Sequence, residues 1–283
     1  MQIMATRSTA SMTRVAGVIG WPVQHSLSPA LHNAAFAAAG LDWVYGTFEV
    51  APARATAALE ALRVLGLGGL SVTTPHKEDV AAAVDDLSPA AHALRSVNTV
   101  VVDGDRLVGH STDGDGFVAS LAAAAVDVTD LTVAVLGAGA AARSIVDALG
   151  RAGASSIAVV NRTAARAEEA AALAAAADVG TSDDVTSADV VVNATAVGMG
   201  TDVLPLDVAV LRSGQVVADV VYHPLDTALL RAATAAGCRT VDGLGMLVHQ
   251  AVLQQVLWTG IRPDPAVLRA AAVAELTRRN SGL

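Results

Sequence analysis

The stretch Leu131–Leu149 constrains the fold more than any other part of the chain. It opens with six apolar or β-branched residues, passes through Gly137-Ala138-Gly139-Ala140-Ala141-Ala142, and continues as a helical stretch. A buried strand that enters a helix through a glycine-rich turn is the first unit of a doubly wound sheet. We therefore expect an α/β fold with a parallel sheet covered by helices.

Three further apolar runs follow this unit and alternate with helical stretches. They are SIAVVNRT from Ser156, DVVVNAT from Asp189 and QVVADVVY from Gln215. Strands and helices that alternate in this way build a single doubly wound domain. We expect this Rossmann domain to span residues 115–244.

The first third of the chain also alternates β-rich and helical runs, which predicts an N-terminal α/β domain with a mostly parallel sheet. Ser28-Pro29 and Thr74-Pro75 each place proline after an N-cap residue, so we expect Ser28 and Thr74 to cap helices. A hairpin should turn at Asp103-Gly104-Asp105. The other expected elements are strands at 14–20, 43–50 and 70–74 and helices at 30–39 and 54–65.

The last two helical stretches, 245–258 and 265–278, follow no further strand. We expect them to pack back on the first domain, so that residues 14–114 and 245–283 form one discontinuous substrate domain. Residues 1–13 lack the apolar run of a signal peptide and are expected to form a flexible leader.

Composition and charge exclude several classes of partner. The chain has 18 basic and 27 acidic side chains, a formal charge of -9 and no basic cluster, so neither nucleic acid nor an anionic membrane is expected to bind. Residues 243–261 carry no acidic or basic side chain except histidine, yet their Gln and His side chains favour a helix buried in protein over a membrane span. The single cysteine, Cys238, can form no intrachain disulfide, and we expect a cytoplasmic protein.

The glycine-rich turn fits the G-x-G-x-x-G/A pattern of dinucleotide-binding units. Gly137 permits the tight turn, and Gly139 lets the backbone approach a pyrophosphate at the positive end of the helix dipole. We expect the backbone from Gly137 through Ala138, Gly139, Ala140 and Ala141 to bind a dinucleotide. A turn that binds no ligand is the alternative for this motif taken alone.

The residues after the second strand of this domain favour NADP(H) over NAD(H). An acidic residue there would bind the ribose 2′-hydroxyl of NAD, but the strand ends in Asn161-Arg162-Thr163, with Arg166 one turn further. Two guanidinium groups and a hydroxyl can bind a 2′-phosphate through charge-assisted hydrogen bonds worth about 1.5 to 3 kcal/mol each. The alternative is that Thr163 caps its helix and both arginines are solvated.

Lys77 and Asp113 are candidates for proton transfer. Lys77 is expected in the first turn of a helix, where the helix dipole disfavours a cation, and a lysine in such a place is suited to acid–base work. Asp113 precedes the Rossmann domain and should face the cleft between the domains. The spacing does not show whether the two side chains meet, and an exposed lysine and a turn aspartate are the alternatives.

From Val15 onward, several separate segments resemble the shikimate dehydrogenase family, which includes shikimate and quinate dehydrogenases. Their shared order makes the resemblance specific. It implies an NADP-dependent oxidoreductase that reversibly reduces 3-dehydroshikimate to shikimate in aromatic amino acid biosynthesis. The segments are Gly20 to Pro29, Val72-Thr73-Thr74-Pro75-His76-Lys77, Val97-Asn98-Thr99, Thr112-Asp113-Gly114, Asn161 to Arg166, Asp219-Val220-Val221-Tyr222 and Asp242 to Gln250.

The resemblance also implies roles for single residues. Lys77 and Asp113 match the catalytic lysine and aspartate of the family, and Val220 and Gly243 are implied to lie beside the nicotinamide. The residues implied to bind substrate are Ser26 and Ser28 at the carboxylate, Asn98 at the ring hydroxyls, and Thr73, Asp113, Tyr222 and Gln250.

The chain departs from the family pattern at three positions. Ser71 and Ser111 stand where the family usually has Asn, and Ala140 stands where it usually has Gly. Ser71 bears on substrate choice, because a shorter polar side chain near the ring changes its hydrogen bonding. Ser26 and Ser28 favour shikimate over quinate, which carries an extra hydroxyl beside the carboxylate. A quinate or aminoshikimate dehydrogenase, and a catalytically silent NADPH-binding regulator, are the alternatives.

No metal is expected, since the histidines show no H-E-x-x-H or similar ligand spacing. The expected partners are a small-molecule substrate and the cofactor, and we expect a monomer or homodimer. The seven histidines are His25, His32, His76, His92, His110, His223 and His249.

Overall fold

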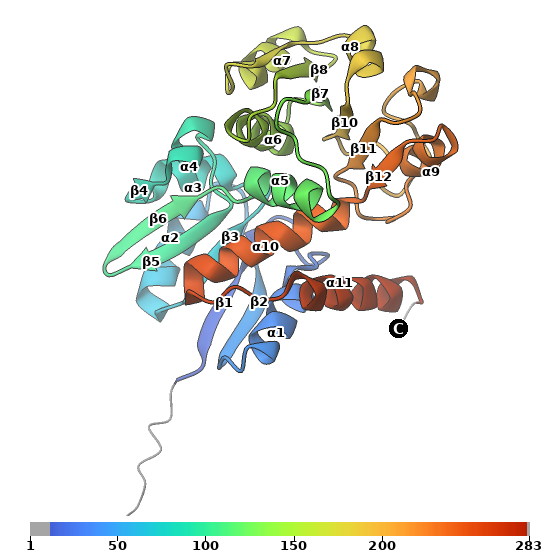
Figure 1. Cartoon of the computed structure of the whole chain (residues 1–283). Helices are drawn as coiled ribbons and strands as arrows, with labels where there is room; N and C mark the ends of the chain where they lie inside the picture. Colours follow the sequence, from blue (N-terminus) through green and yellow to red (C-terminus); the bar gives the residue numbers. More distant parts are fainter. Residues whose placement is uncertain (1–11, 282–283) are drawn as a thin grey trace, which may run out of the picture.

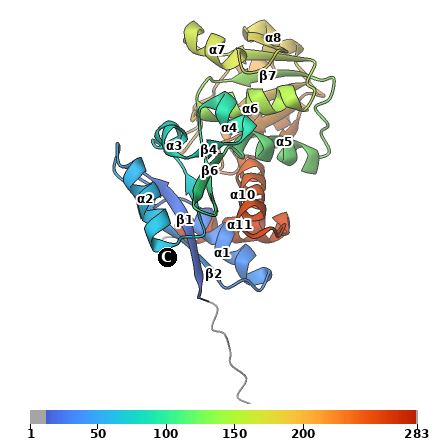
Figure 2. The same ribbon diagram turned by 90° about the vertical axis from the view of Figure 1, so that its left-hand side faces the viewer.

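The computed structural model describes residues 12–281, and its two six-stranded sheets lie in separate lobes (Figure 1). Strands β1–β6 form the first sheet and β7–β12 the second. A turned view shows the same two lobes, one above the other (Figure 2). The architecture confirms the predicted α/β fold class. The leader expected at residues 1–13 lies almost wholly outside the described residues.

The first sheet is mostly parallel and contains one antiparallel hairpin. β1 pairs in parallel with β2 and β3, β4 pairs in parallel with β6, and β5 is antiparallel to β3 and β6. The hairpin turns at Gly104-Asp105, as the sequence predicted. The strands are β1 (Arg14–Gly20), β2 (Trp43–Glu49), β3 (Gly69–Val72), β4 (Asp86–Leu87), β5 (Thr99–Asp103) and β6 (Arg106–His110), in the order β2-β1-β3-β5-β6-β4.

Both helix caps predicted in this lobe are wrong. Helix α1 begins at Ser28 itself, whose N–H donates to the Ser26 hydroxyl at 3.2 Å. Helix α3 begins at Lys77, because a turn closed by the His76 N–H and the Thr73 carbonyl comes first. Neither helix has a side-chain cap. The helices of this lobe are α1 (Ser28–Ala38), α2 (Ala55–Leu65), α3 (Lys77–Ala83) and α4 (Pro89–Leu94).

The second sheet is parallel throughout, which confirms the doubly wound prediction. Its order is β12-β11-β10-β7-β8-β9, so the chain reverses direction across the sheet between β7 and β10. Ligands of such sheets bind at the carboxyl ends of the strands beside this point. The strands are β7 (Thr132–Leu136), β8 (Ser156–Val160), β9 (Ala177–Val179), β10 (Val190–Asn193), β11 (Val216–Asp219) and β12 (Arg239–Val241). The helices are α6 (Ala140–Arg151), α7 (Ala164–Ala171), α8 (Ser182–Ser187), α9 (Ala228–Ala235) and the 3₁₀ turn η1 (Val208–Val210).

Helix α5 (Asp113–Ala123) packs between α6 and α10 (Gly243–Thr259). A Cβ atom at Gly114 would lie 2.0 Å from the backbone carbonyl oxygen of Ser144 in α6. One at Gly116 would lie 2.6 Å from the backbone nitrogen of Gln250 in α10. The two glycines therefore allow backbone-to-backbone approach on both sides of α5. This packing fixes the first residue of α5, Asp113, where the lobes meet.

The C-terminal helices return to the first lobe, as predicted. Helix α10 begins two residues before the predicted start, because the Asp242 carboxylate caps it and accepts from the Leu244 and Gly245 N–H groups at 3.1 and 3.3 Å. Helix α11 (Pro265–Asn280) packs on α1 and α10. Within residues 12–281, no helix has both the length and the apolar character needed to cross a membrane.

Substitution Gly114→Ala should destabilise the protein. The added methyl group overpacks the contact with the α6 backbone at a cost of about 1 to 3 kcal/mol, which outweighs a gain in helix propensity of about 1 kcal/mol or less. Thermal unfolding should show a lower Tm. Gly46→Ala is the control, since its Cβ would meet no atom within 4 Å. Equal Tm values for the two variants would contradict the close packing of α5.

Candidate active site

A cavity of about 220 Å³ lies where the two lobes meet. Lys77 and Asp113 line it, as do the predicted substrate residues Thr73, Asn98, Tyr222 and Gln250 and the predicted cofactor residues Ala141, Val220 and Gly243. Ser71, which the sequence analysis placed near the ring, lines it too. Prediction from the sequence missed the remaining lining residues, which are Val18 and Val72 on the first sheet and Met246, Leu247 and Gln254 on α10.

Lys77 and Asp113 form a hydrogen-bonded ion pair inside this cavity. The Lys77 Nζ donates to Asp113 Oδ2 at 2.5 Å, and the two side chains are only 19% and 16% exposed. Lys77 is the first residue of α3, so the carboxylate offsets the unfavourable helix dipole at that position. Lys77 is also the only lysine in the chain. A paired ammonium group facing a small cavity can deliver a proton to a bound ligand.

Asn98 orients Asp113. Its Nδ2 donates to Asp113 Oδ1 at 2.7 Å and to the Thr112 hydroxyl at 2.9 Å, while its Oδ1 accepts from the Thr112 N–H at 2.9 Å and the Thr99 hydroxyl at 2.8 Å. The residue is 3% exposed. Both N–H bonds of its amide are therefore engaged within the protein. A ring hydroxyl can accept from Asn98 only by replacing one of these bonds.

The floor of the cavity is a buried polar network around Ser71 and Gln254. The Tyr45 hydroxyl donates to Ser71 Oγ at 2.6 Å, and Ser71 donates to Gln254 Oε1 at 2.7 Å. Gln254 Nε2 then donates to the Thr99 hydroxyl at 3.0 Å. The only proton of the Ser71 hydroxyl is therefore engaged by protein. Gln254 follows the predicted residue Gln250 by four positions, and this helical spacing was a signal that could have found it.

His32 continues this network beneath the floor. Its Nε2 lies 3.2 Å from Gln254 Oε1, and its Nδ1 lies 3.2 Å from Gln255 Nε2. An amide oxygen only accepts and an amide nitrogen only donates, so His32 is neutral with its proton on Nε2. Complete burial lowers the pKa of His32 to about 3, although the Gln254 hydrogen bond opposes the shift. The ring stacks on Tyr45 at a centroid distance of 4.4 Å.

Asp219 fixes the loop that carries Val220 and Tyr222. At the end of β11, its carboxylate accepts from the Val221 N–H at 3.0 Å, the Thr227 hydroxyl at 2.8 Å and Asn193 Nδ2 at 2.9 Å. Burial raises the pKa of the Asp219 carboxyl and, separately, the pKa of the Tyr222 hydroxyl.

Ser26 and Ser28 do not line the cavity, and their predicted contact with a substrate carboxylate stays a prediction. The Ser26 hydroxyl accepts from the Ser28 N–H, and Ser28 is buried. Arg279 of α11 donates to the carbonyls of His25 at 2.5 Å and Ser26 at 3.1 Å. The C-terminal helix therefore holds the serine loop in place.

The glycine-rich turn has the geometry of a phosphate-binding site. Gly137 adopts φ = 108°, and a Cβ there would lie 2.9 Å from the Thr195 side chain. Gly139 is exposed, and a Cβ there would meet no atom within 4 Å, which leaves room for a pyrophosphate at the start of α6. Ala142, at the third position of the pattern, is fully buried and lets α6 pack closely on the sheet. These residues fit a dinucleotide.

The segment after β8 presents free polar groups. Thr163 precedes α7, but its side chain makes no cap hydrogen bond, so the capping alternative is wrong for its hydroxyl. Arg162 and Arg166 are exposed, and their side chains make no hydrogen bond or ion pair within residues 12–281. Asn161 Nδ2 donates to the Thr163 carbonyl at 3.0 Å and closes the turn. Two unpaired guanidinium groups and a hydroxyl therefore lie together beside the second strand.

The histidines form no metal site in the described part of the chain. Residues 12–281 contain no group of three or more His, Cys, Asp or Glu side chains arranged to hold an ion. His76, next to Lys77, is buried, with its Nε2 2.7 Å from the Val50 carbonyl oxygen.

A doubly wound lobe with a dinucleotide turn, set against a cavity that holds a lysine–aspartate pair, defines a dinucleotide-dependent dehydrogenase. Comparisons with known proteins agree. Residues 18–100 match the shikimate dehydrogenase substrate binding domain, residues 120–199 match shikimate / quinate 5-dehydrogenase, and residues 243–273 match the shikimate 5′-dehydrogenase C-terminal domain. The chain belongs to the shikimate dehydrogenase family.

Individual relatives match over almost the whole chain. The shikimate dehydrogenase (NADP(+)) of Symbiobacterium thermophilum is 45% identical over 278 residues, which cover 93% of this chain and 95% of the relative. A shikimate dehydrogenase solved in complex with NADP+ has a TM-score of 0.88 at 34% identity, with 93% of this chain and 96% of that chain covered. The Thermus thermophilus enzyme solved with NADP(H) and shikimate has a TM-score of 0.85 at 36% identity, with 92% and 99% covered.

The neutral state of His32 predicts a loss of stability in mild acid. Because the pKa of His32 is about 3 in the folded protein and about 6.5 in the unfolded chain, the unfolded state binds more protons between these values. The free energy of unfolding should fall as the pH drops below about 6.5, by up to about 1.4 kcal/mol per pH unit. Urea unfolding at pH 7.5, 6.0 and 5.0 measures this slope. The slope should be smaller in His32→Gln, and an unchanged slope would contradict the assignment.

Proposed function

We propose that the protein interconverts 3-dehydroshikimate and shikimate with NADP(H) as its cofactor. The observation that carries the proposal is the 2.5 Å Lys77–Asp113 pair in a small cavity that Ala141 of the dinucleotide-binding turn also lines. Family membership supports the substrate and the cofactor. Oxidation of shikimate and quinate with NADP+ and NAD+, followed in parallel at the nicotinamide absorbance band, tests the proposal.

The chain's part in the reaction is proton transfer. Reduction of a ketone adds a hydride to carbon and a proton to oxygen; NADPH supplies the hydride when bound. Lys77 Nζ gives its proton to the carbonyl oxygen as negative charge develops there, and takes it back when shikimate is oxidised. Asp113 holds the ammonium group and accepts a hydrogen bond from the neighbouring ring hydroxyl.

The groups with hydrogen-bonding capacity to spare would hold the substrate. The Thr73 and Tyr222 hydroxyls make no hydrogen bond within residues 12–281, and Gln250 uses one N–H on the Leu247 carbonyl at 2.8 Å. These three side chains face the cavity and would orient the ring, with Asn98 acting on it and on Asp113. Ser26 and Ser28 would bind the carboxylate.

The second lobe would hold the cofactor. The backbone from Gly137 to Ala141 would bind the pyrophosphate, and Asn161, Arg162, Thr163 and Arg166 would bind the 2′-phosphate. Val220 and Gly243, which line the cavity, would lie beside the nicotinamide.

The chain would be organised as one discontinuous substrate domain and one cofactor domain. Residues 14–114 and 245–283 would form the substrate domain and residues 115–244 the cofactor domain. Since α10 begins at Gly243, the second boundary falls within the first turn of this helix. We further propose a cytoplasmic protein, monomeric or homodimeric, whose partners are its substrate and its cofactor.

Quinate is the second candidate substrate. Ser71 bears on the choice, because its hydroxyl donates to Gln254 and the longer side chain that usually stands there in the family is missing. The ratio of kcat/KM for shikimate and quinate decides between them. A protein that binds NADPH but turns over neither acid would instead be a regulator.

Substitution Lys77→Ala should lower kcat by about 10² to 10⁴ with a smaller effect on KM, because the proton donor is lost while most substrate contacts remain. Lys77→Arg is the matched variant. It keeps the charge beside Asp113, but a guanidinium group cedes its proton very poorly, so kcat should remain low. Near-normal turnover by either variant would remove Lys77 from proton transfer.

The double substitution Arg162→Gln and Arg166→Gln should raise KM for NADP+ about tenfold or more, because contacts to the 2′-phosphate are lost. KM for NAD+, which lacks this phosphate, should change little in the same variant. Equal effects on the two cofactors would show that the arginines do not recognise the phosphate.

A further inference from the structure

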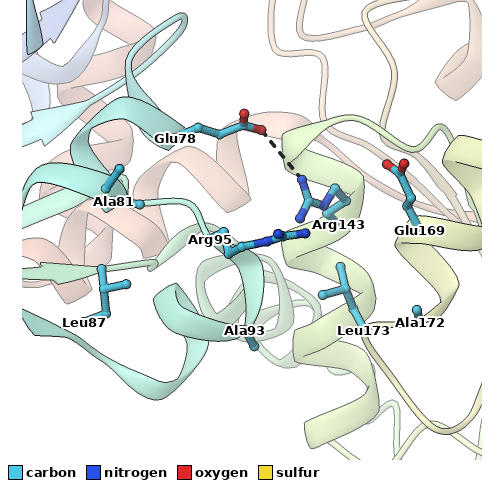
Figure 3. Close-up of a pocket in the computed structure, with 10 residues that line it drawn as sticks. Glu78, Ala81, Leu87, Ala93, Arg95, Arg143, Glu169, Ala172 and Leu173 are labelled. Carbon is cyan, nitrogen blue, oxygen red and sulfur yellow. Dashed lines mark ion pairs between the residues drawn. The ribbon is translucent and has the colours of Figure 1, made fainter.

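Arg143 of the second lobe contacts α3, which begins at Lys77, and the end of α4, four residues before Asn98. It lies in the first turn of α6, and its side chain is 21% exposed. Its Nη2 donates to the Leu94 carbonyl, at the end of α4, at 2.9 Å. Its Nη1 lies 3.8 Å from Oε1 of Glu78, and Glu78 is the residue that follows Lys77 in α3. Figure 3 shows Arg143 facing Glu78 across the cleft between the lobes.

The two segments that Arg143 reaches are joined to each other behind this contact. The Val97 N–H, three residues after Leu94, donates to the Lys77 carbonyl at 3.0 Å. Asn98 comes next and orients Asp113 at 2.7 Å. A shift of the Leu94 carbonyl would therefore move the backbone that carries Asn98 and holds Lys77.

The Leu94 contact is the stronger of the two. It is a charge-assisted hydrogen bond to a carbonyl at a helix end, where no partner within the helix is available. The Glu78 side chain is 76% exposed, and an exposed ion pair at 3.8 Å contributes little. Arg143 thus acts mainly on the segment 94–98.

Arg143 is also close in sequence to the phosphate-binding turn. Gly139 precedes α6, and Ala141, in the same helical turn as Arg143, lines the candidate active-site cavity. One turn of helix therefore presents N–H groups to the dinucleotide site and a guanidinium group to the other lobe.

We propose that Arg143 is a positioning residue that holds Lys77 and the Asn98–Asp113 hydrogen bond in register with the cofactor lobe. The expected effect on kcat rests on the proposed function. The expected effect on the placement of Lys77 does not. Arg143 contacts neither Lys77 nor Asp113 and acts through the segment 94–98.

Arg95 supplies a matched control. It lines a second pocket, separate from the candidate active-site cavity, which Glu78 and Arg143 also line. Figure 3 shows its side chain extending towards Arg143. The Arg95 side chain makes no hydrogen bond or ion pair within residues 12–281. The same change from Arg to Gln at the two positions therefore removes the same charge from the cleft, but only Arg143→Gln removes a contact with Leu94.

The first experiment reads out Lys77 without any turnover. Because Lys77 is the only lysine, protein labelled with ¹³C-lysine gives one ε-methylene signal in an NMR spectrum. Arg143→Gln should change the chemical shift of this signal, and Arg95→Gln should leave it as in the wild type. An unchanged signal in Arg143→Gln, or an equal change in Arg95→Gln, would overturn the proposal.

The second experiment separates positioning from substrate binding. In full-length enzyme, Arg143→Gln should lower kcat about tenfold, because a displaced proton donor slows the chemical step, while KM for shikimate changes less than about twofold. A loss confined to Tm, with kcat unchanged, would mean that Arg143 is only structural and would overturn the proposal. If the wild type fails to oxidise shikimate, the proposed function fails, and the NMR comparison still decides the placement of Lys77.

Discussion

The ion pair between Lys77 and Asp113 is the interaction on which the rest of the site depends. Both side chains are largely removed from water, and either charge would be costly to bury there alone. The two groups come from the first residues of α3 and α5, and Asn98 holds the carboxylate from a third segment. Asp113 reaches Lys77 only because α5 packs closely on α6 and α10 at Gly114 and Gly116. The packing between helices thus sets how Lys77 and Asp113 meet.

The polar side chains that line the cavity fall into two sets, one fully hydrogen-bonded within the protein and one with hydrogen-bonding capacity to spare. On the floor, Ser71 and Gln254 are engaged with Tyr45, Thr99 and the neutral His32. A buried polar network of this kind is stable only when its donors and acceptors are satisfied, and it then holds its members rigidly. Thr73, Tyr222 and Gln250 keep capacity for a ligand. If the proposed function holds, these three side chains set the specificity, and Ser71 and Gln254 set the shape of the cavity beneath them.

The start of α6 serves both lobes. On one side a Cβ at Gly139 would meet no atom within 4 Å, which leaves room for a pyrophosphate at the start of the helix. On the other side Arg143 donates to the Leu94 carbonyl of the first lobe. Arg162, just after the next strand, and Arg166, in helix α7, have side chains without a hydrogen bond or ion pair in the described part of the chain, which leaves both guanidinium groups available to a phosphate. The first turn of α6 thus adjoins the dinucleotide turn on one side and contacts the first lobe on the other.

The sequence by itself determined the two α/β lobes, the doubly wound order, the hairpin at Gly104-Asp105 and the family, because strand–turn–helix patterns and contiguous motifs are local properties. It did not determine the caps of α1 and α3, since a local hydroxyl and a preceding turn replaced the expected bonds. Only the tertiary structure decided that Lys77 meets Asp113, that Ser71 is engaged by Gln254, and that Arg143 reaches Leu94. Each of these contacts joins residues 36 to 183 positions apart. Such contacts depend on how helices pack and which donors burial forces to pair, and no local pattern records either.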